Sequence, residues 1–251
     1  MKEKSANITD RLPAAVSLLL IILLWWALSA SNAIPNYMLP SPAAVVRAFI
    51  DDFSNLMYHA RTSVLEALYG LLIGIGLAFF IATLMDRFLL IERALNPILI
   101  ISQTIPTIAI APLLVLWMGF GMAPKITLVV ITTFFPISVG LLEGYKSVDP
   151  DCINLLRSMG AGRVQLFHHV KLPAALPHFF SGLRISASYA VVGAVISEWL
   201  GGFEGLGVYM TRVKKAYAFD RMFAVIILIV IISLLLMALV DLIRKLVIRW
   251  R

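Results

Sequence analysis

The sequence predicts an all-α protein that crosses a membrane six times, and two observations carry this prediction. Of the 251 residues, 61% are hydrophobic and only 14% are charged, and the mean hydropathy of +0.93 is far above that of a soluble domain. Six apolar runs are each long enough to cross a bilayer as a helix, which satisfies its own backbone hydrogen bonds in lipid. The runs cover residues 13–30, 64–85, 97–117, 125–142, 176–200 and 222–240.

The first run also fits a cleaved signal peptide. Lys2 and Lys4 precede it, and the segment ALSASNA supplies small residues for cleavage. The run is nevertheless long enough to span a bilayer, and the rest of the chain is a membrane protein in either case. We therefore expect a retained anchor.

The distribution of lysine and arginine predicts the orientation. An even number of spans places both termini on one side, and with the termini inside, the inner segments hold fourteen of these residues and the outer segments seven. Because cytoplasmic segments carry the excess of basic residues, we expect both termini in the cytoplasm. The chain then divides into cytoplasmic residues 1–12, one transmembrane domain over 13–245, and cytoplasmic residues 246–251.

Composition and motifs also argue against several classes of function. The net charge of +7 suits cytoplasmic loops facing anionic lipid better than it suits nucleic acid. The single Cys152 cannot form an internal disulfide. The histidines His168, His169 and His178 lack the i, i+4 spacing of a helical zinc site, so we expect no metal. No phosphate-binding motif G-x-x-x-x-G-K-[ST] occurs, so energy has to come from a partner or an ion gradient.

A basic segment interrupts the apolar sequence in the longest inner loop, residues 143–175. Asp149 is a suitable N-cap, Pro150 suits the first helical position, and Gly160 can close the helix in the left-handed conformation. A second short helix should follow and end at Leu172 and Pro173, because the residue before a proline disfavours the helical conformation.

The first of these short helices presents a small apolar face to a partner or to the bundle. Leu155, Leu156 and Met159 recur at helical spacing beside Arg157. Such a face fits the groove of another protein, and it equally fits a solvated loop whose apolar residues pack back against the membrane helices. Spacing alone does not separate these alternatives.

The loop resembles the cytoplasmic signature of ATP-binding-cassette (ABC) importer permeases. That signature reads Glu-Ala-Ala, three residues, Gly, nine residues, an aliphatic residue, one residue, Leu-Pro. Gly160, Val170, Leu172 and Pro173 fit it, whereas residues 154–156, Asn-Leu-Leu, replace Glu-Ala-Ala. The segments YMLPSP, QTIPTIAIAPLLVLWMGFG and SEWLGGFEGLGVYM are similar to the nitrate, sulfonate and taurine branch of these permeases.

This resemblance implies a type I (MetI-like) permease subunit in a bacterial inner membrane, with no enzymatic activity of its own. It implies a second permease copy, two cytoplasmic ATPase subunits that bind ATP and Mg, and an extracytoplasmic solute-binding protein. The coupling residues would be Asn154, Leu155, Leu156, Arg157, Met159, Gly160, Phe167, Leu172 and Pro173. A secondary transporter is the rival class, but six spans without an internal repeat are unusual for one.

Two of the predicted spans carry residues of special interest. The second span carries a stripe of small residues, Gly70, Gly74, Ala78 and Ala82. Such a stripe lets another helix approach closely, either as a packing surface or as a sliding surface.

In the third span, Pro106 and Pro112 each remove a backbone donor. A broken helix at membrane depth requires surrounding protein or a water-filled cavity. A kink satisfied by neighbouring helices and a solute path both fit; by analogy with relatives, Gln103, Thr104, Pro106 and Thr107 would line the path.

Glu198 is an acid within the fifth span and has two interpretations. An ionisable residue at membrane depth is a candidate for function, but Gly201 and Gly202 follow at once, so Glu198 also fits a structural cap at a helix end. Its position puts it in the tentative path group with Ser188 and Tyr189.

The segment SEWLGGFEGLGVYMTRVKKAYAFDRMFA resembles permeases for the pyrimidine precursor of thiamine. This resemblance implies that precursor as the solute. Permeases for alkanesulfonate, taurine or nitrate are the alternative. The spans carry almost no basic residues that would face an anion. They offer neutral hydrogen-bonding groups at Gln103, Thr104, Thr107, Ser186, Ser188 and Tyr189.

Overall fold

The computed structural model describes residues 8–31, 34–35 and 37–249, and every regular element among them is helical. The predicted all-α class is therefore confirmed. The chain divides into two compact units, one formed by Met1–Met57 with Met210–Ile227 and the other by Tyr58–Tyr209 with Leu228–Arg251. The boundaries between the units fall within the sequences of α3 (Phe53–Arg87), α10 (Leu206–Lys215) and α11 (Phe219–Val247).

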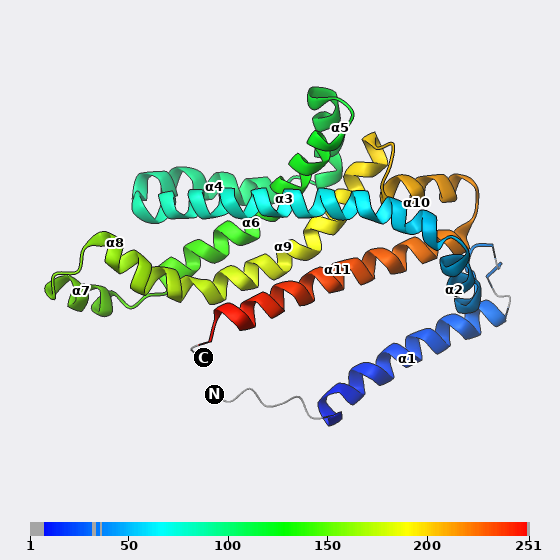
Figure 1. Ribbon diagram of the computed structural model, residues 1–251, viewed down its shortest axis with the longest axis horizontal. Coiled ribbons are helices and arrows are strands. Elements are labelled where there is room, and N and C mark those ends of the chain that lie inside the picture. Colours follow the sequence, from blue (N-terminus) through cyan, green and yellow to red (C-terminus); the bar gives the residue numbers. More distant parts are fainter. Residues whose placement is uncertain (1–7, 32–33, 36, 250–251) are drawn as a thin grey trace. The chain divides into compact units, whose positions relative to one another are not determined.

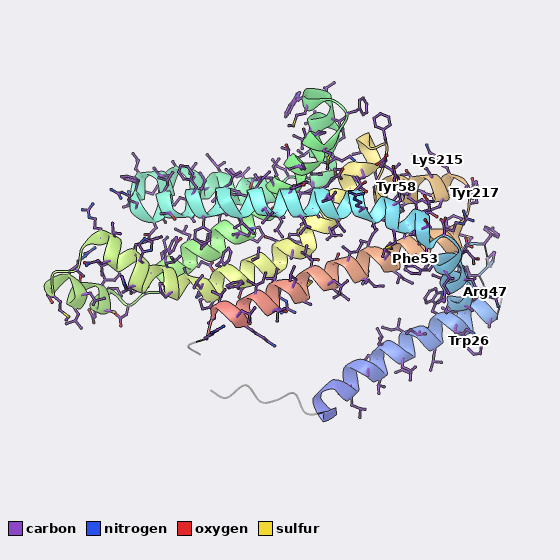
Figure 2. The ribbon with its side chains drawn as sticks, in the orientation of Figure 1. Trp26, Arg47, Phe53, Tyr58, Lys215 and Tyr217 are labelled. Carbon is purple, nitrogen blue, oxygen red and sulfur yellow. The ribbon has the colours of Figure 1, made fainter. Side chains whose placement is uncertain are left out.

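The first unit contains α1 (Ile8–Ala30) and α2 (Pro42–Asp51). The Ser41 hydroxyl caps α2 by accepting from the Ala44 amide, and Pro42 occupies the first turn. The indole of Trp25 donates to the Pro40 carbonyl at 3.0 Å, which ties α1 to the segment before α2. Trp26 and Tyr217 (Figure 2) line a cavity of about 560 Å³ within this unit.

The core of the second unit is the close packing of α6 (Met122–Lys146) against α9 (Leu172–Gly201). Glycines make this approach possible. A Cβ at Gly182 would overlap the Pro136 carbonyl oxygen, and a Cβ at Gly144 would overlap Ala175. Buried Ile137, Ala187 and Ala190 fill the interface, and α11 adds Val240 to the same core.

The helix α3 packs on α6 through the predicted stripe of small residues. A Cβ at Gly70 would overlap the Val129 side chain, and a Cβ at Gly74 would meet the Thr133 hydroxyl at 2.5 Å. Ala78 and Ala82 are fully buried in the same core. The stripe is therefore a helix-packing surface in this conformation.

Four helices of the described chain are long and apolar enough to cross a membrane, and a bent pair raises the number to five. They are α3, α6, the continuous segment Arg163–Gly201, and α11. The apolar part of α1, Ala15–Ala30, is shorter. The sixth span thus stays a prediction. The helices extend beyond the predicted runs, for example by eleven residues at the start of α3.

The third predicted span is a broken helix and not one straight segment. It is formed by α4 (Leu89–Thr104) and α5 (Thr107–Met118), whose axes differ by 101°. The bend lies at Ile105 and Pro106, both in extended conformation. Pro106 cannot donate a backbone hydrogen bond and restricts the residue before it, which explains the break. Figure 1 shows α5 turned away from the direction of α4.

The prediction that Leu172 and Pro173 end the second loop helix is wrong. The short helix α8 (Arg163–Leu166) leads through a π-helical turn, η1 (Phe167–Lys171), directly into α9. The Leu172 amide donates to the Phe167 carbonyl five residues back, so the turn is widened just before the Pro173 ring. Pro173 itself lies in the first turn of α9, where its missing N–H costs little.

Candidate functional site

Three regions of the second unit carry the candidate functional residues. They are the segment α7–α8–η1 (Figure 1), a cavity beside the break at Pro106, and a buried polar network at the ends of α3, α6 and α9. The first two contain residues singled out by the sequence. The third contains one such residue, Glu198, with partners that the sequence did not reveal.

The helix α7 (Pro150–Ser158) forms as its local sequence predicts. The Asp149 carboxylate accepts from the Asp151 amide at 2.8 Å, and Pro150 occupies the first turn. Gly160 adopts a left-handed φ of +87°, and the Ala161 amide then donates to the Leu156 carbonyl at 3.0 Å. The predicted N-cap and the predicted left-handed glycine are both confirmed.

The apolar face of α7 does not pack back against the bundle. No residue of the helix is buried, and the side chains of Leu155 and Met159 are 62% and 75% exposed. Leu156 is half-buried, and Asn154 and Arg157 are exposed. Of the two alternatives that the spacing left open, the structure favours the free apolar face.

Other predicted coupling residues lie apart from this face. Phe167 is partly buried, and its ring lies 5.4 Å from that of the buried Tyr145. Leu172 and Pro173 are half-buried in the helical segment that continues into α9. These residues lie where the segment α7–α8–η1 meets the core, and α7 carries the exposed part.

A cavity of about 320 Å³ lies beside the break between α4 and α5. It brings together four of the predicted path residues: Gln103, Pro106 and Thr107 from the broken span and Tyr189 from α9. No charged side chain lines it among the described residues. The remaining lining residues are Ser102, Ile105, Ile110, Ile131, Thr132, Val192, Gly193 and Ile196.

The other tentative path residues are not part of this cavity. The Thr104 hydroxyl donates to the Ile101 carbonyl at 2.8 Å. The buried Ser186 donates to the Thr133 carbonyl at 2.8 Å, which fastens α9 to α6. Ser188 is half-buried outside the lining. Pro112 lies inside α5 without breaking it.

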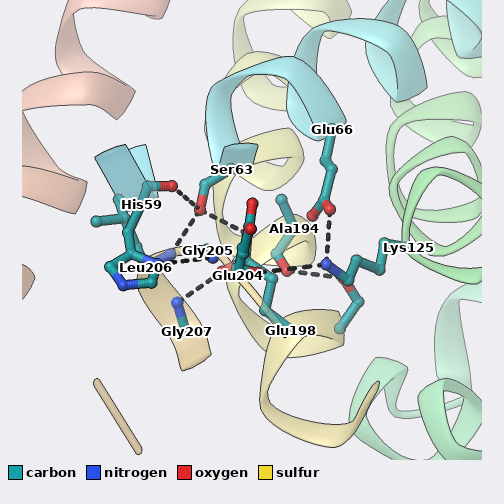
Figure 3. Close-up of polar contacts among 11 residues, drawn as sticks. His59, Ser63, Glu66, Lys125, Ala194, Glu198, Glu204, Gly205, Leu206 and Gly207 are labelled. Atoms are coloured by element: carbon teal, nitrogen blue, oxygen red, sulfur yellow. Dashed lines mark hydrogen bonds and ion pairs between the residues drawn. The ribbon is translucent and has the colours of Figure 1, made fainter. Parts of the chain in front are cut away.

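Glu198 lies in a buried polar network (Figure 3) and is only 1% exposed. Its Oε1 accepts from the Ser63 hydroxyl at 2.5 Å, and its Oε2 accepts from the Gly207 amide at 2.6 Å. Ser63 Oγ also accepts from the Leu206 amide at 2.8 Å. The carboxylate therefore anchors residues 205–207, where α10 begins, and does not reach the cavity at Pro106.

Glycine at positions 205 and 207 lets the backbone approach the Glu198 carboxylate closely. Gly205 has a φ of +120°, and a Cβ there would overlap the carboxylate of Glu198. A Cβ at Gly207 would overlap the Val195 carbonyl. The Gly205 amide donates to His59 Nδ1 at 3.1 Å, so α3 and α9 hold this turn together.

An ion pair completes the network. Lys125 Nζ lies 2.7 Å from Glu66 Oε1, and their side chains are 5% and 0% exposed. Lys125 also donates to the Glu204 carbonyl at 3.4 Å. The second oxygen of Glu66, Oε2, is buried without a hydrogen-bond partner in the part of the chain that the structure describes. Two carboxylates and one ammonium thus share this interior.

Sequence reasoning missed His59, Ser63, Glu66 and Lys125. A signal was available: Glu66 lies near the start of the second apolar run, Lys125 starts the fourth, and Glu198 lies near the end of the fifth. With alternating span direction, these positions fall at the same membrane side. Charged residues at membrane depth tend to pair, which would have suggested this contact.

Comparison with known proteins identifies relatives over nearly the whole chain. Residues 70–250 match the family described as "Binding-protein-dependent transport system inner membrane component". A probable ABC transporter permease protein of Haemophilus influenzae is 38% identical over 88% of this chain and 90% of its own. The formylaminopyrimidine transport permease ThiX of Halalkalibacterium halodurans is 36% identical over 92% of this chain and 93% of its own. The putative aliphatic sulfonates permease SsuC of Bacillus subtilis is 30% identical over 92% and 84%.

The fold is also similar to a solved transporter structure. An inward-facing structure of the MetNI methionine ABC transporter matches with a TM-score of 0.60, covering 76% of this chain and 94% of the other at 21% identity. At this identity the match concerns the fold. The expected MetI-like fold is thereby supported, and the family match favours an ABC importer over a secondary transporter.

Proposed function

The chain belongs to the family of binding-protein-dependent transport system inner membrane components, and we propose that it is the permease of an ABC importer for a pyrimidine precursor of thiamine. The observation that carries the solute is the 36% identity to the formylaminopyrimidine permease over 92% of the chain. The chain is not itself an enzyme, and ATP and Mg bind to separate ATPase subunits.

The chemistry of the cavity at Pro106 suits a neutral heterocycle. Its polar groups are the amide of Gln103 and the hydroxyls of Ser102, Thr107, Thr132 and Tyr189, which can donate to or accept from ring nitrogens and amino groups. A sulfonate or nitrate carries a full negative charge and would require a basic side chain or directed amides. The described lining contains no basic side chain.

Coupling to ATP hydrolysis would pass through α7. The exposed Leu155 of α7 and its C-cap residue Met159 form a small apolar face that a groove on an ATPase subunit can bind. The continuous segment from Arg163 to Gly201 connects this region to the core. A movement imposed on the coupling segment would then reach α9 and the cavity beside it.

The assembly would consist of two copies of this chain, two ATPase subunits and an extracytoplasmic solute-binding protein. The distribution of lysine and arginine supports a cytoplasmic location for α7 and for both termini. Single cysteines at positions 160 and 210, in a Cys152→Ala background, test this orientation with an impermeant thiol reagent on intact cells. Labelling at 160 from outside would overturn the orientation and the coupling role.

Growth rescue with the complete transport operon tests the solute. One bacterial host requires the thiamine pyrimidine, and a second requires an alkanesulfonate as its sulfur source. We expect rescue of the first host alone. Rescue of only the second host would reject the pyrimidine and would assign this permease to the sulfonate group, to which the 30% identical relative belongs.

A further inference from the structure

A second cavity, of about 490 Å³, lies between the end of α3 and the segment α7–α8–η1. Its lining is strongly basic, with Arg87 from α3, Arg157 from α7, Arg163 from α8, and His168 and Lys171 from η1. Asp86 is the one acid that lines it among the described residues. The predicted solute path does not use this cavity, whereas Arg157 and Phe167 of its lining are also predicted coupling residues.

The positive charge of the cavity is only partly neutralised. Asp86 accepts from Lys171 Nζ with both oxygens, at 2.7 and 2.8 Å, so this pair cancels. The three arginines have no carboxylate partner in the described part of the chain, although Arg87 also lies over the Phe88 ring at 5.4 Å. All three arginines are exposed, so solvent screens their mutual repulsion in part, and an anion bound between them would neutralise it further.

The walls combine this charge with apolar surface. Ile153, Val164, Leu166 and Phe167 line the same cavity, and Phe167 is held in place by its contact with Tyr145. The volume is in the range of small-molecule sites. A cavity of this kind suits an anion that carries a nonpolar part better than a free inorganic ion.

The cavity also lies where a membrane surface is expected. The apolar stretch of α3 ends at Asp86 and Arg87, and the next residues, Phe88 and Leu90, are 46% and 81% exposed. A phospholipid headgroup at this depth would face the arginines while its acyl chains run along exposed apolar side chains. Basic pockets between membrane helices bind anionic headgroups in this way.

We propose that this cavity binds a phosphate-bearing anion, and that its occupant is the phosphodiester headgroup of an anionic phospholipid. Arginine recognises phosphate oxygens with two parallel N–H donors, which lysine cannot do. Because Arg87 belongs to α3 and Arg157 to α7, one headgroup would tie the coupling helix to the membrane-spanning core. This role is additional to solute transport and to ATPase docking.

The test measures lipid and phosphate binding by the purified full-length chain. Phosphatidylglycerol and phosphatidylcholine are titrated in native mass spectrometry, and inorganic phosphate is titrated separately by its effect on thermal unfolding. We expect phosphatidylglycerol to bind and Arg157→Gln/Arg163→Gln to weaken it by about tenfold or more. Arg157→Lys/Arg163→Lys should give an intermediate affinity. Arg93→Gln, which removes one exposed charge on α4 outside the cavity, should bind as the parent does.

Each outcome decides the proposal. Binding of phosphatidylglycerol that is equal in the parent and in Arg157→Gln/Arg163→Gln would overturn it. Protection by inorganic phosphate without phosphatidylglycerol binding would keep the anion site and reject the lipid as its source. Loss of ATPase association in the variant with no change in either anion titration would make these arginines a protein contact and would also overturn the proposal. The unfolding temperature without ligand identifies a variant that has simply failed to fold, and the lysine variant then carries the test.

Discussion

The two ends of the second unit use polar and apolar residues in opposite ways. At one end, Glu66, Lys125 and Glu198 are buried and hold α3, α6, α9 and the start of α10 together. At the other end, α7 has no buried residue and exposes Leu155 and Met159. The buried network suits a rigid part of the structure, whereas the exposed apolar face gains its stabilisation only on contact with a partner. Mutations should therefore change folding stability at the first end and association at the second.

The largest expected effect is at Lys125. Replacing Lys125 with Met leaves the buried Glu66 carboxylate without a counter-charge, and breaking a buried ion pair costs about 3–5 kcal/mol of unfolding free energy. Thermal unfolding in detergent measures this loss. The double variant Glu66→Gln/Lys125→Met should recover much of it, because no unpaired charge remains.

Lys146 provides the matched control. It forms an ion pair with Glu92 at 2.5 Å, but its side chain is 53% exposed. Lys146→Met should cost less than about 1 kcal/mol, since solvent screens an exposed pair. Equal losses at positions 125 and 146 would mean that burial does not distinguish the two ends.

The second effect concerns Glu198. Glu198→Ala removes the acceptor for the Ser63 hydroxyl and the Gly207 amide, both buried, which should cost about 2–3 kcal/mol. In the same variant, hydrogen exchange at the amides of Leu206 and Gly207 should be faster than in the parent protein. Glu204→Ala is the control on the same turn, because the Glu204 carboxylate contacts only the exposed Tyr58 hydroxyl among the described side chains. Unchanged exchange at Gly207 in Glu198→Ala would show that the carboxylate does not hold this turn.

Local signals in the sequence predicted α7, but they could not predict the network. Asp149, Pro150 and Gly160 act within one helix, and each took its expected conformation. The contacts of Glu198 with Ser63 and of Lys125 with Glu66 join positions 135 and 59 residues apart, and no periodicity encodes which helices meet.

Pro173 shows a different limit of the sequence. A proline was expected to end the helix here, but the π-helical turn η1 before Pro173 lets the helix continue into α9. The apolar pattern of the sequence does not reveal this turn. The helix lengths were also underestimated, because α3 includes residues 53–63, a segment of mixed polarity that lies outside the predicted apolar run.

The third effect should leave stability unchanged. Leu155→Asp places a charge on the exposed face of α7, so the unfolding free energy should change by less than about 0.5 kcal/mol. Co-purification of the proposed ATPase subunit should weaken by about tenfold, since one buried Leu contributes about 1.5–3 kcal/mol before ordering costs. Ser158→Asp puts the same charge on α7 without removing apolar surface. If Ser158→Asp weakened association as much as Leu155→Asp, charge and not the apolar face would govern docking.

Gly160→Ala is expected to have only a small effect on global stability, and Gly205→Ala provides the comparison. Gly160 has a φ of +87° and no atom within 4 Å of an added Cβ, so Gly160→Ala costs only the left-handed conformation, about 1–2 kcal/mol. This cost falls on α7 alone, because α7 buries no side chain. Amide exchange in the last turn of α7 should accelerate, while the unfolding temperature should hardly change.

Gly205 also has a positive φ, of +120°, but its added Cβ would collide with the Glu198 carboxylate. Gly205→Ala should therefore lower the unfolding temperature as strongly as Glu198→Ala does. A large loss of global stability in Gly160→Ala would show that α7 is part of the folded core and not a free docking helix.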